Sequence, residues 1–236
     1  MLLRCRVLSP KSPTEVLWID DAAVEVVGGE IVSVGPWQGG LADEDLRPAV
    51  IVPGFVDAHL HYPQTRIVGA ASGPLLDWLK KSTFPEEGLF DDPEHARDVA
   101  KLFVQKMQGA GTTLAMVYGS VHDVSAYALF DELDRSGMRA VAGPVLMDAH
   151  CPTELQVPVD EAIPFLENLA ESWNGRHDGR LRVAVVPRFA LSCTRELLEE
   201  VGRLARRESW HVHTHACENR DEVTAVERAT GMTNLA

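Results

Sequence analysis

The chain has 236 residues, of which 45% are hydrophobic and 24% charged, a composition typical of a globular protein with room for one large domain and a small one. Its formal net charge of -13 argues against a nucleic-acid partner, because phosphate binding requires clustered lysines and arginines. Four cysteines without a Cys-x-x-Cys pair, arginines at positions 4 and 6, and no apolar run of about 20 residues predict a soluble, cytoplasmic protein with no membrane partner.

Residues 1–52 have the pattern of short strands and turns. Strand-like runs cover 15–19 and 23–27, and Gly28 with Gly29 forms a hairpin turn signal that leads into a returning strand at 30–34. We therefore expect a small β unit, too small to be stable by itself.

Beyond Pro53 the chain alternates between strand-like and helix-like segments. The expected strands are 55–61, 112–118, 139–147, 181–186 and 210–215, and the expected helices are 93–109, 123–136, 159–173, 194–207 and 219–229. A long loop is expected between the first strand and the first helix. The alternation predicts a parallel sheet, as in a doubly wound open sheet or part of a (β/α)8 barrel. No Gly-x-Gly-x-x-Gly follows a strand, which disfavours a dinucleotide fold.

Two histidines end the first of these strands. His59 and His61 lie on one face of it, because successive side chains of a strand point to opposite faces. Two neutral imidazoles held on one rigid wall can enter the same metal coordination sphere. A bare His-x-His is more often an ordinary structural pair, but here Phe55 and Val56 have the composition of a buried strand. We therefore expect the pair at the end of a core strand.

The fifth strand ends in a second group of polar residues. His215 closes the strand and Glu218 follows where a helix begins. A barrel would bring the first and fifth strands to one mouth, where His59, His61 and His215 could converge on one ion. Glu218 could then accept a proton from a metal-activated water, or it could simply complement the helix dipole.

Three neighbours of these residues are expected to be structural. His211 and His213 share the face of His215 but lie farther from the rim, so we expect them inside the barrel. Cys217 could also bind a metal ion, but its position between His215 and Glu218 favours a packing role.

Several segments resemble a known family. Pro-Gly-Phe-Val-Asp-Ala-His-Leu-His at 53–61, with a β unit before it and His-x-x-Glu at 215–218, resembles the metal-dependent amidohydrolase superfamily, whose fold is a (β/α)8 barrel with a small β-sandwich. Four further segments are together similar to the guanine deaminase family: His-Tyr-Pro-Gln at 61–64, residues 75–79 with 83–85, Pro-Arg-Phe-Ala-Leu-Ser-Cys at 187–193, and residues 215–223. The resemblance implies part of the β-sandwich over 1–52 and an incomplete barrel over 53–236.

The resemblance also implies roles for individual residues. It assigns the binding of one Zn²⁺ ion to His59, His61 and His215, proton transfer to Glu218, and purine binding to Gln64, Arg188 and Phe189. An amide can pair with a purine edge, a guanidinium can donate to the carbonyl at C6, and an aromatic face can stack on the ring. Without the resemblance, these last three would be a loop amide, a surface arginine and a core phenylalanine. Trp78 and Leu76 are expected to line the same pocket.

The implied reaction is hydrolytic deamination of guanine at C2, which yields xanthine and ammonia in purine catabolism. Another cyclic amidine or a pterin is the alternative substrate, and histidine ligands suit iron as well as zinc. A homodimer is the family expectation.

The sequence departs from the family at its end. The family continues through three more strands, with a metal-binding histidine on the sixth and a metal-binding aspartate on the eighth, whereas this sequence ends at Ala236. A complete barrel requires about 250 residues. We therefore expect a truncated product or a fragment of a longer enzyme, and the second hypothesis is a non-catalytic remnant without two metal ligands.

Overall fold

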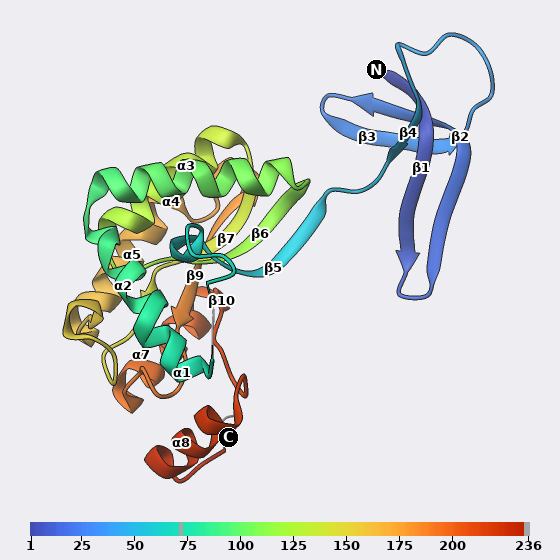
Figure 1. The fold of residues 1–236 in the computed structure, drawn as a ribbon. Coiled ribbons are helices and arrows are strands. Elements are labelled where there is room, and N and C mark those ends of the chain that lie inside the picture. Colours follow the sequence, from blue (N-terminus) through green and yellow to red (C-terminus); the bar gives the residue numbers. More distant parts are fainter. Residues whose placement is uncertain (71–72, 234–236) are drawn as a thin grey trace. The chain divides into compact units, whose positions relative to one another are not determined.

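The computed structural model describes residues 1–70 and 73–233 (Figure 1). The chain divides into two compact units, Met1–Gly54 and Phe55–Ala236. Each unit contains its own sheet and its own buried cluster.

The first unit is a sheet with the strand order β3-β2-β1-β4. Its strands are β1 (Leu2–Ser12), β2 (Glu15–Val27), β3 (Glu30–Pro36) and β4 (Glu44–Ile51). β1 pairs antiparallel with β2 and parallel with β4, and the buried side chains of Cys5, Val7, Ala22 and Val24 form its core. Gly28 and Gly29 make the predicted hairpin between β2 and β3, with φ of 61° and 87°, which glycine adopts at little cost.

The prediction of two separate strands at 15–19 and 23–27 was wrong. The structure has one strand, β2, because its ladder with β1 continues through an irregularity between Cys5 and Val7. A bulge of this kind shifts the register without ending the strand, and only pairing with β1 reveals it.

The second unit contains the predicted parallel sheet, with the order β10-β9-β7-β6-β5. The strands on this path are β5 (Phe55–His61), β6 (Thr112–Tyr118), β7 (Arg139–Gly143), β9 (Leu181–Pro187) and β10 (His211–Val212). The short strand β8 (Val145–Leu146) lies off the path and pairs with β9. Neighbours in space follow each other along the chain, as they do in a barrel, whereas a doubly wound sheet reverses its order at a switch point. The sheet is therefore an incomplete (β/α) barrel in the described residues, and the open-sheet alternative is wrong.

Helices follow most of the strands (Figure 1). They are α3 (Pro93–Gly109), α4 (Asp123–Ser136), α5 (Val159–Trp173), α6 (Arg176–Gly179), α7 (Arg195–Glu208) and α8 (Arg220–Thr230). Their ends obey local signals: the Asp92 side chain accepts a hydrogen bond from the Glu94 amide at 2.9 Å, and Gly137 ends α4 with φ of 75°. The main core cluster of this unit contains four large buried aromatic side chains, those of Tyr62, Phe90, Phe103 and Phe130. No helix of the described segments is long and apolar enough to cross a membrane.

The connection after β5 is more ordered than the predicted loop. It contains the helical turns η1 (Tyr62–Gln64), α1 (Leu75–Trp78), η2 (Leu79–Thr83), α2 (Phe84–Glu87) and η3 (Gly88–Asp91). Leu79 and Phe84 from this segment pack in a cluster with Tyr118. Prolines and glycines suggested a loop here, and the packing that orders it comes from residues distant in the sequence.

Two predicted strands are shorter in the structure. The strand expected at 139–147 breaks into β7 and β8 at Pro144, which has no amide hydrogen to donate. The strand expected at 210–215 is regular only over β10, and His215 is held instead by an isolated bridge to Phe189.

Candidate active site

Three histidines converge at the carboxyl ends of the parallel strands. His59 and His61 end β5, and the His215 amide donates to the Arg188 carbonyl at 2.9 Å just beyond β9. One ring nitrogen from each histidine lies within 4.8 Å of the others, and Nε2 of His61 lies 3.1 Å from Nε2 of His215. The structure thus brings together the three residues that the sequence singled out as a group.

The hydrogen bond made by the His215 ring shows which of its two nitrogens has a free lone pair for a metal ion. Nδ1 lies 2.8 Å from the Arg188 carbonyl oxygen, which can only accept, so Nδ1 carries the hydrogen. In the neutral ring Nε2 is then unprotonated and directed at His61. A backbone carbonyl that fixes the tautomer of an imidazole is a common feature of histidine metal ligands.

Burial keeps two of these imidazoles neutral. The pKa of His215 is lowered to about 4, mainly by desolvation. The hydrogen bond to the Arg188 carbonyl opposes this shift, and the charges of His59 and Arg188 add to it. The pKa of His61 also lies well below its ordinary value. Desolvation is the main cause, and the charges of Arg188, His215 and His59 add to it. Neutral imidazole is the form that binds a metal ion, and it persists here through the neutral pH range.

The donor set fits a zinc ion. Two nitrogens at ordinary zinc distances and a tetrahedral angle lie about 3.3 Å apart. The 3.1 Å between Nε2 of His61 and Nε2 of His215 is close to that value. Nδ1 of His61 is also buried without a hydrogen-bond partner among the described residues, so the ring is held by packing.

Tyr118 supplies that packing, and the sequence analysis missed it. The tyrosine ends β6, and its ring centroid lies 4.5 Å from that of His61 in a stacked arrangement and 4.6 Å from that of His215. Burial raises the pKa of Tyr118 to about 12, so the phenol stays neutral. The available signal was its position: Tyr118 is the last residue of a strand whose neighbour ends in His61.

A cavity of about 270 Å³ opens beside the histidines. It is lined by His59, Leu60, His61, Gln64, Leu75, Trp78, Leu79, Arg188, Phe189, His215, Glu218 and Glu222. All seven predicted site residues therefore border one space, together with Trp78. Leu76 is not among the lining residues and packs with the cluster around Leu79 instead.

Glu218 reaches the cavity from the turn before α8. Its side chain is exposed, and its backbone amide donates to Oε2 of Glu222 at 2.8 Å. Glu222 in turn forms a capping box with Asn219 at the start of α8. Asn219 and Glu222 therefore cap the helix. The Glu218 carboxylate is not needed for capping and borders the same cavity as the histidines.

A buried polar network forms another part of the cavity wall. Arg188 donates from Nη1 to Oε2 of Glu87 at 2.5 Å, with side-chain exposures of 3% and 2%. Gln64 donates from Nε2 to Oε1 of the same carboxylate at 3.3 Å. The Arg188 guanidinium also lies over the Phe84 ring, 5.2 Å from its centroid. The sequence analysis did not single out Glu87, although it lies two residues after the family-like segment 83–85.

The expectations for the neighbours of His215 were only partly right. His213 is buried and stacks on Tyr118 at 5.6 Å between ring centroids. His211 is exposed, so its predicted interior position was wrong: it lies on β10, the end strand of the described sheet. Cys217 is also exposed, with φ of 58°, and does not pack as expected.

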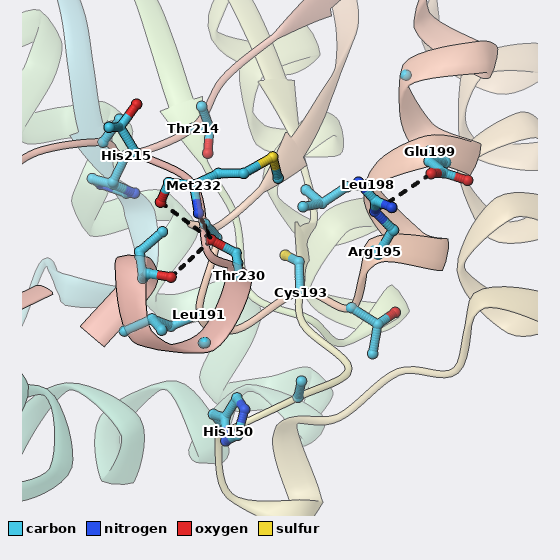
Figure 2. A pocket seen from close by; sticks show the side chains of 18 of the residues that line it. His150, Leu191, Cys193, Arg195, Leu198, Glu199, Thr214, His215, Thr230 and Met232 are labelled. Carbon is cyan, nitrogen blue, oxygen red and sulfur yellow. Dashed lines mark hydrogen bonds and ion pairs between the residues drawn. The ribbon is translucent and has the colours of Figure 1, made fainter. Parts of the chain in front are cut away.

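His215 also borders a second, larger cavity of about 1110 Å³ (Figure 2). Thr230 and Met232 border it near the end of α8, and Arg195 and Glu199 pair along α7 at 3.7 Å. Burial raises the pKa of its Cys193 to about 11, and this thiol donates to the Leu146 carbonyl oxygen at 3.3 Å. Cys193 is therefore a packed, neutral thiol, and the convergent polar groups lie in the smaller cavity.

Comparison with known proteins finds relatives along most of the chain. The model of the amidohydrolase family matches residues 50–235. Guanine deaminase of Escherichia coli (strain K12) is 38% identical over 219 residues, which are 89% of this chain and 49% of that protein. The solved structure of E. coli guanine deaminase has a TM-score of 0.92 at 34% identity, over 99% of this chain and 58% of that chain. Guanine deaminase from C. acetobutylicum with bound guanine in the active site has a TM-score of 0.92 at 27% identity, over 99% and 57% of the two chains.

The chain spans about half the length of the curated relatives it matches. These relatives agree with the resemblance that residues 53–64, 187–193 and 215–223 indicated.

Proposed function

This chain belongs to the amidohydrolase family, and from that membership we propose that it carries part of the active site of a zinc-dependent guanine deaminase. The reaction is hydrolysis of guanine at C2 to xanthine and ammonia. The observation that carries the proposal is the convergence of His59, His61 and His215 beside a cavity that Gln64 and Arg188 also line. A metal-binding group thus adjoins groups that can pair with a purine.

His59, His61 and His215 are the residues that would hold one zinc ion. The ion would act as a Lewis acid and lower the pKa of a water molecule to about 7. The lowered pKa values of His61 and His215 keep these ligands unprotonated, and Tyr118 stacks against both rings. Each of these features favours metal binding over protonation of the site.

Glu218 is the proposed proton carrier. It borders the same cavity as the three histidines, and the capping box of α8 is formed by Asn219 and Glu222 rather than by Glu218. A carboxylate in this place can accept a proton from the attacking water and return it to the departing nitrogen at C2.

Gln64, Arg188 and Phe189 are the proposed purine-binding residues. Phe189 is 8% exposed and borders the cavity, and an aromatic ring in this place can stack on a planar purine. Arg188 can donate to the carbonyl at C6, since its guanidinium has only donors. Gln64 can pair with the adjoining purine edge.

The test uses the chain of residues 1–236 as purified. Metal content and ammonia release from guanine are measured for the wild type, for Glu218→Gln and for Glu227→Gln, which changes an exposed carboxylate on α8. We expect stoichiometric zinc in all three, and ammonia release that Glu218→Gln lowers by roughly 10²- to 10⁴-fold.

Each other result has a definite meaning. Iron in place of zinc would correct the metal. Bound zinc without ammonia release would favour a non-catalytic remnant. A metal-free chain, or release that is equal in Glu218→Gln and the wild type, would contradict the proposal. Ammonia release from another cyclic amidine but not from guanine would correct the substrate.

A further inference from the structure

Glu87 is the shared acceptor of two side chains that face the same cavity. Its Oε2 accepts from Nη1 of Arg188 at 2.5 Å, and its Oε1 accepts from Nε2 of Gln64 at 3.3 Å. The carboxylate reaches these partners from the end of α2, and its side chain is 2% exposed. A single buried group therefore connects Gln64 in the turn after β5 with Arg188 after β9.

The chemistry of Glu87 determines which way the Gln64 amide points. A carboxylate that is paired with a guanidinium offers only acceptors. The amide nitrogen of Gln64 must then face Glu87, because its oxygen would meet another acceptor there. The amide oxygen is then turned away from Glu87, and because Gln64 lines the cavity, this oxygen is the acceptor that Gln64 can offer there, while Arg188 can offer only donors.

This pairing of an acceptor with donors matches one class of purine edge. A 6-oxopurine carries a hydrogen on N1 next to a carbonyl at C6, a donor beside an acceptor. A 6-aminopurine has the reverse order, with an acceptor at N1 and a donor at C6. A 6-aminopurine in the same place would set a donor against the donors of Arg188 and an acceptor against the acceptor of Gln64. Buried polar groups without a partner cost far more free energy than the loss of a contact in water.

We propose that Glu87 is a positioning residue that orients the Gln64 amide and thereby makes the cavity select 6-oxopurines over 6-aminopurines. The inference rests on the proposed function for its substrate class. It adds the residue that sets the selectivity, which acts through Gln64 and Arg188 and does not itself need to touch the purine.

Equilibrium binding tests the inference without any turnover. Hypoxanthine has the 6-oxo edge and no amino group at C2, so it is inert to the proposed reaction, and adenine has the reversed edge. Affinities for both are measured by calorimetry on the zinc-loaded chain. We expect the wild type to prefer hypoxanthine and Glu87→Gln to lower that preference by about 10- to 100-fold, because an amide at position 87 lets Gln64 turn over.

A paired substitution separates orientation from structural support. In the double variant Glu87→Gln with Gln64→Glu, the new amide donates to the new carboxylate, whose other oxygen again offers an acceptor to the cavity. We expect this variant to regain the preference for hypoxanthine. Glu86→Gln is the matched control, since Glu86 pairs with His95 at 3.8 Å and its loss makes the same charge change. Thermal unfolding reports whether each variant is folded.

The outcomes distinguish this inference from the proposed function. A wild-type preference that Glu87→Gln leaves unchanged overturns the inference alone. A folded double variant without the preference also overturns it, even where Glu87→Gln does not fold. A wild type that binds both purines equally overturns the inference and the substrate class together. Selective binding that depends on Glu87, without ammonia release from guanine, supports the inference and contradicts the proposed reaction.

Discussion

His61 and His215 are 154 positions apart in the chain, yet their Nε2 atoms lie 3.1 Å apart. One ends β5 and the other follows β10, so the contact spans the described sheet from one end strand to the other. Only a curved sheet can bring its two ends this close, as the strands of a barrel do. The curvature of the sheet is therefore what creates the candidate metal site.

Removal of one of these rings should strongly weaken zinc binding. We expect His61→Ala to lower zinc affinity by ~100-fold or more, because it leaves two of three converging ligand nitrogens. Zinc should raise the unfolding temperature of the wild type by mass action and leave that of the variant unchanged. Thermal unfolding with and without a chelator measures both effects. His211→Ala removes an exposed histidine of the same segment and should behave like the wild type.

Tyr118 should affect metal affinity through its ring rather than its hydroxyl. The ring stacks on His61 and packs against His215. We expect Tyr118→Phe to retain zinc affinity within about threefold and Tyr118→Leu to lower it by about tenfold, since an aromatic pair contributes up to ~1.5 kcal/mol. Competition with a colorimetric chelator provides the measurement. Equal losses in the two variants would instead assign the effect to the hydroxyl.

The metal-free chain should lose stability as the pH falls from about 6.5 to about 4. The folded pKa of His215 is about 4, below the ordinary value of 6.5, so in this window the unfolded chain binds a proton that the folded chain does not. The contribution of this group is greatest above pH 6.5 and falls by at most ~1.4 kcal/mol per pH unit until about pH 4. Urea unfolding at several pH values measures it. His215→Gln should flatten the dependence, and a slope equal to that of the wild type would exclude His215 as its source.

Gly143 should tolerate no side chain at the end of β7. A Cβ at this position would lie 2.1 Å from the Ala184 carbonyl oxygen in β9, where the two strands are adjacent. We expect Gly143→Ala to lower the free energy of unfolding by ~2 to 4 kcal/mol through separation of the strands. Gly202→Ala in α7 is the control, because its nearest neighbour is the flexible end of Arg206 at 3.6 Å. That change should stabilise the chain by ~0.5 to 1 kcal/mol. Denaturant unfolding of both variants checks the contrast.

Much of the fold could be predicted because its signals are local. The bounds of β5, β6, α3 and α4 agree with the predicted ranges, since alternation, a capping aspartate and a terminal glycine act within a few residues. The alternation of strands and helices also predicted the parallel sheet. Where the prediction failed, in β2 and in the segment after β5, the deciding contacts came from distant parts of the chain.

The sequence by itself determined the polar side chains at the strand ends, because strand periodicity places His59 and His61 on one face and a helix start places Glu218 beside His215. Only the tertiary structure decided what surrounds them. Tyr118 stacks on His61 because the strands that carry them are neighbours in the sheet. Glu87 is buried with Arg188, which lies 101 positions away in the chain. Desolvation and contact between distant segments are properties of the folded chain, so no local pattern encodes them.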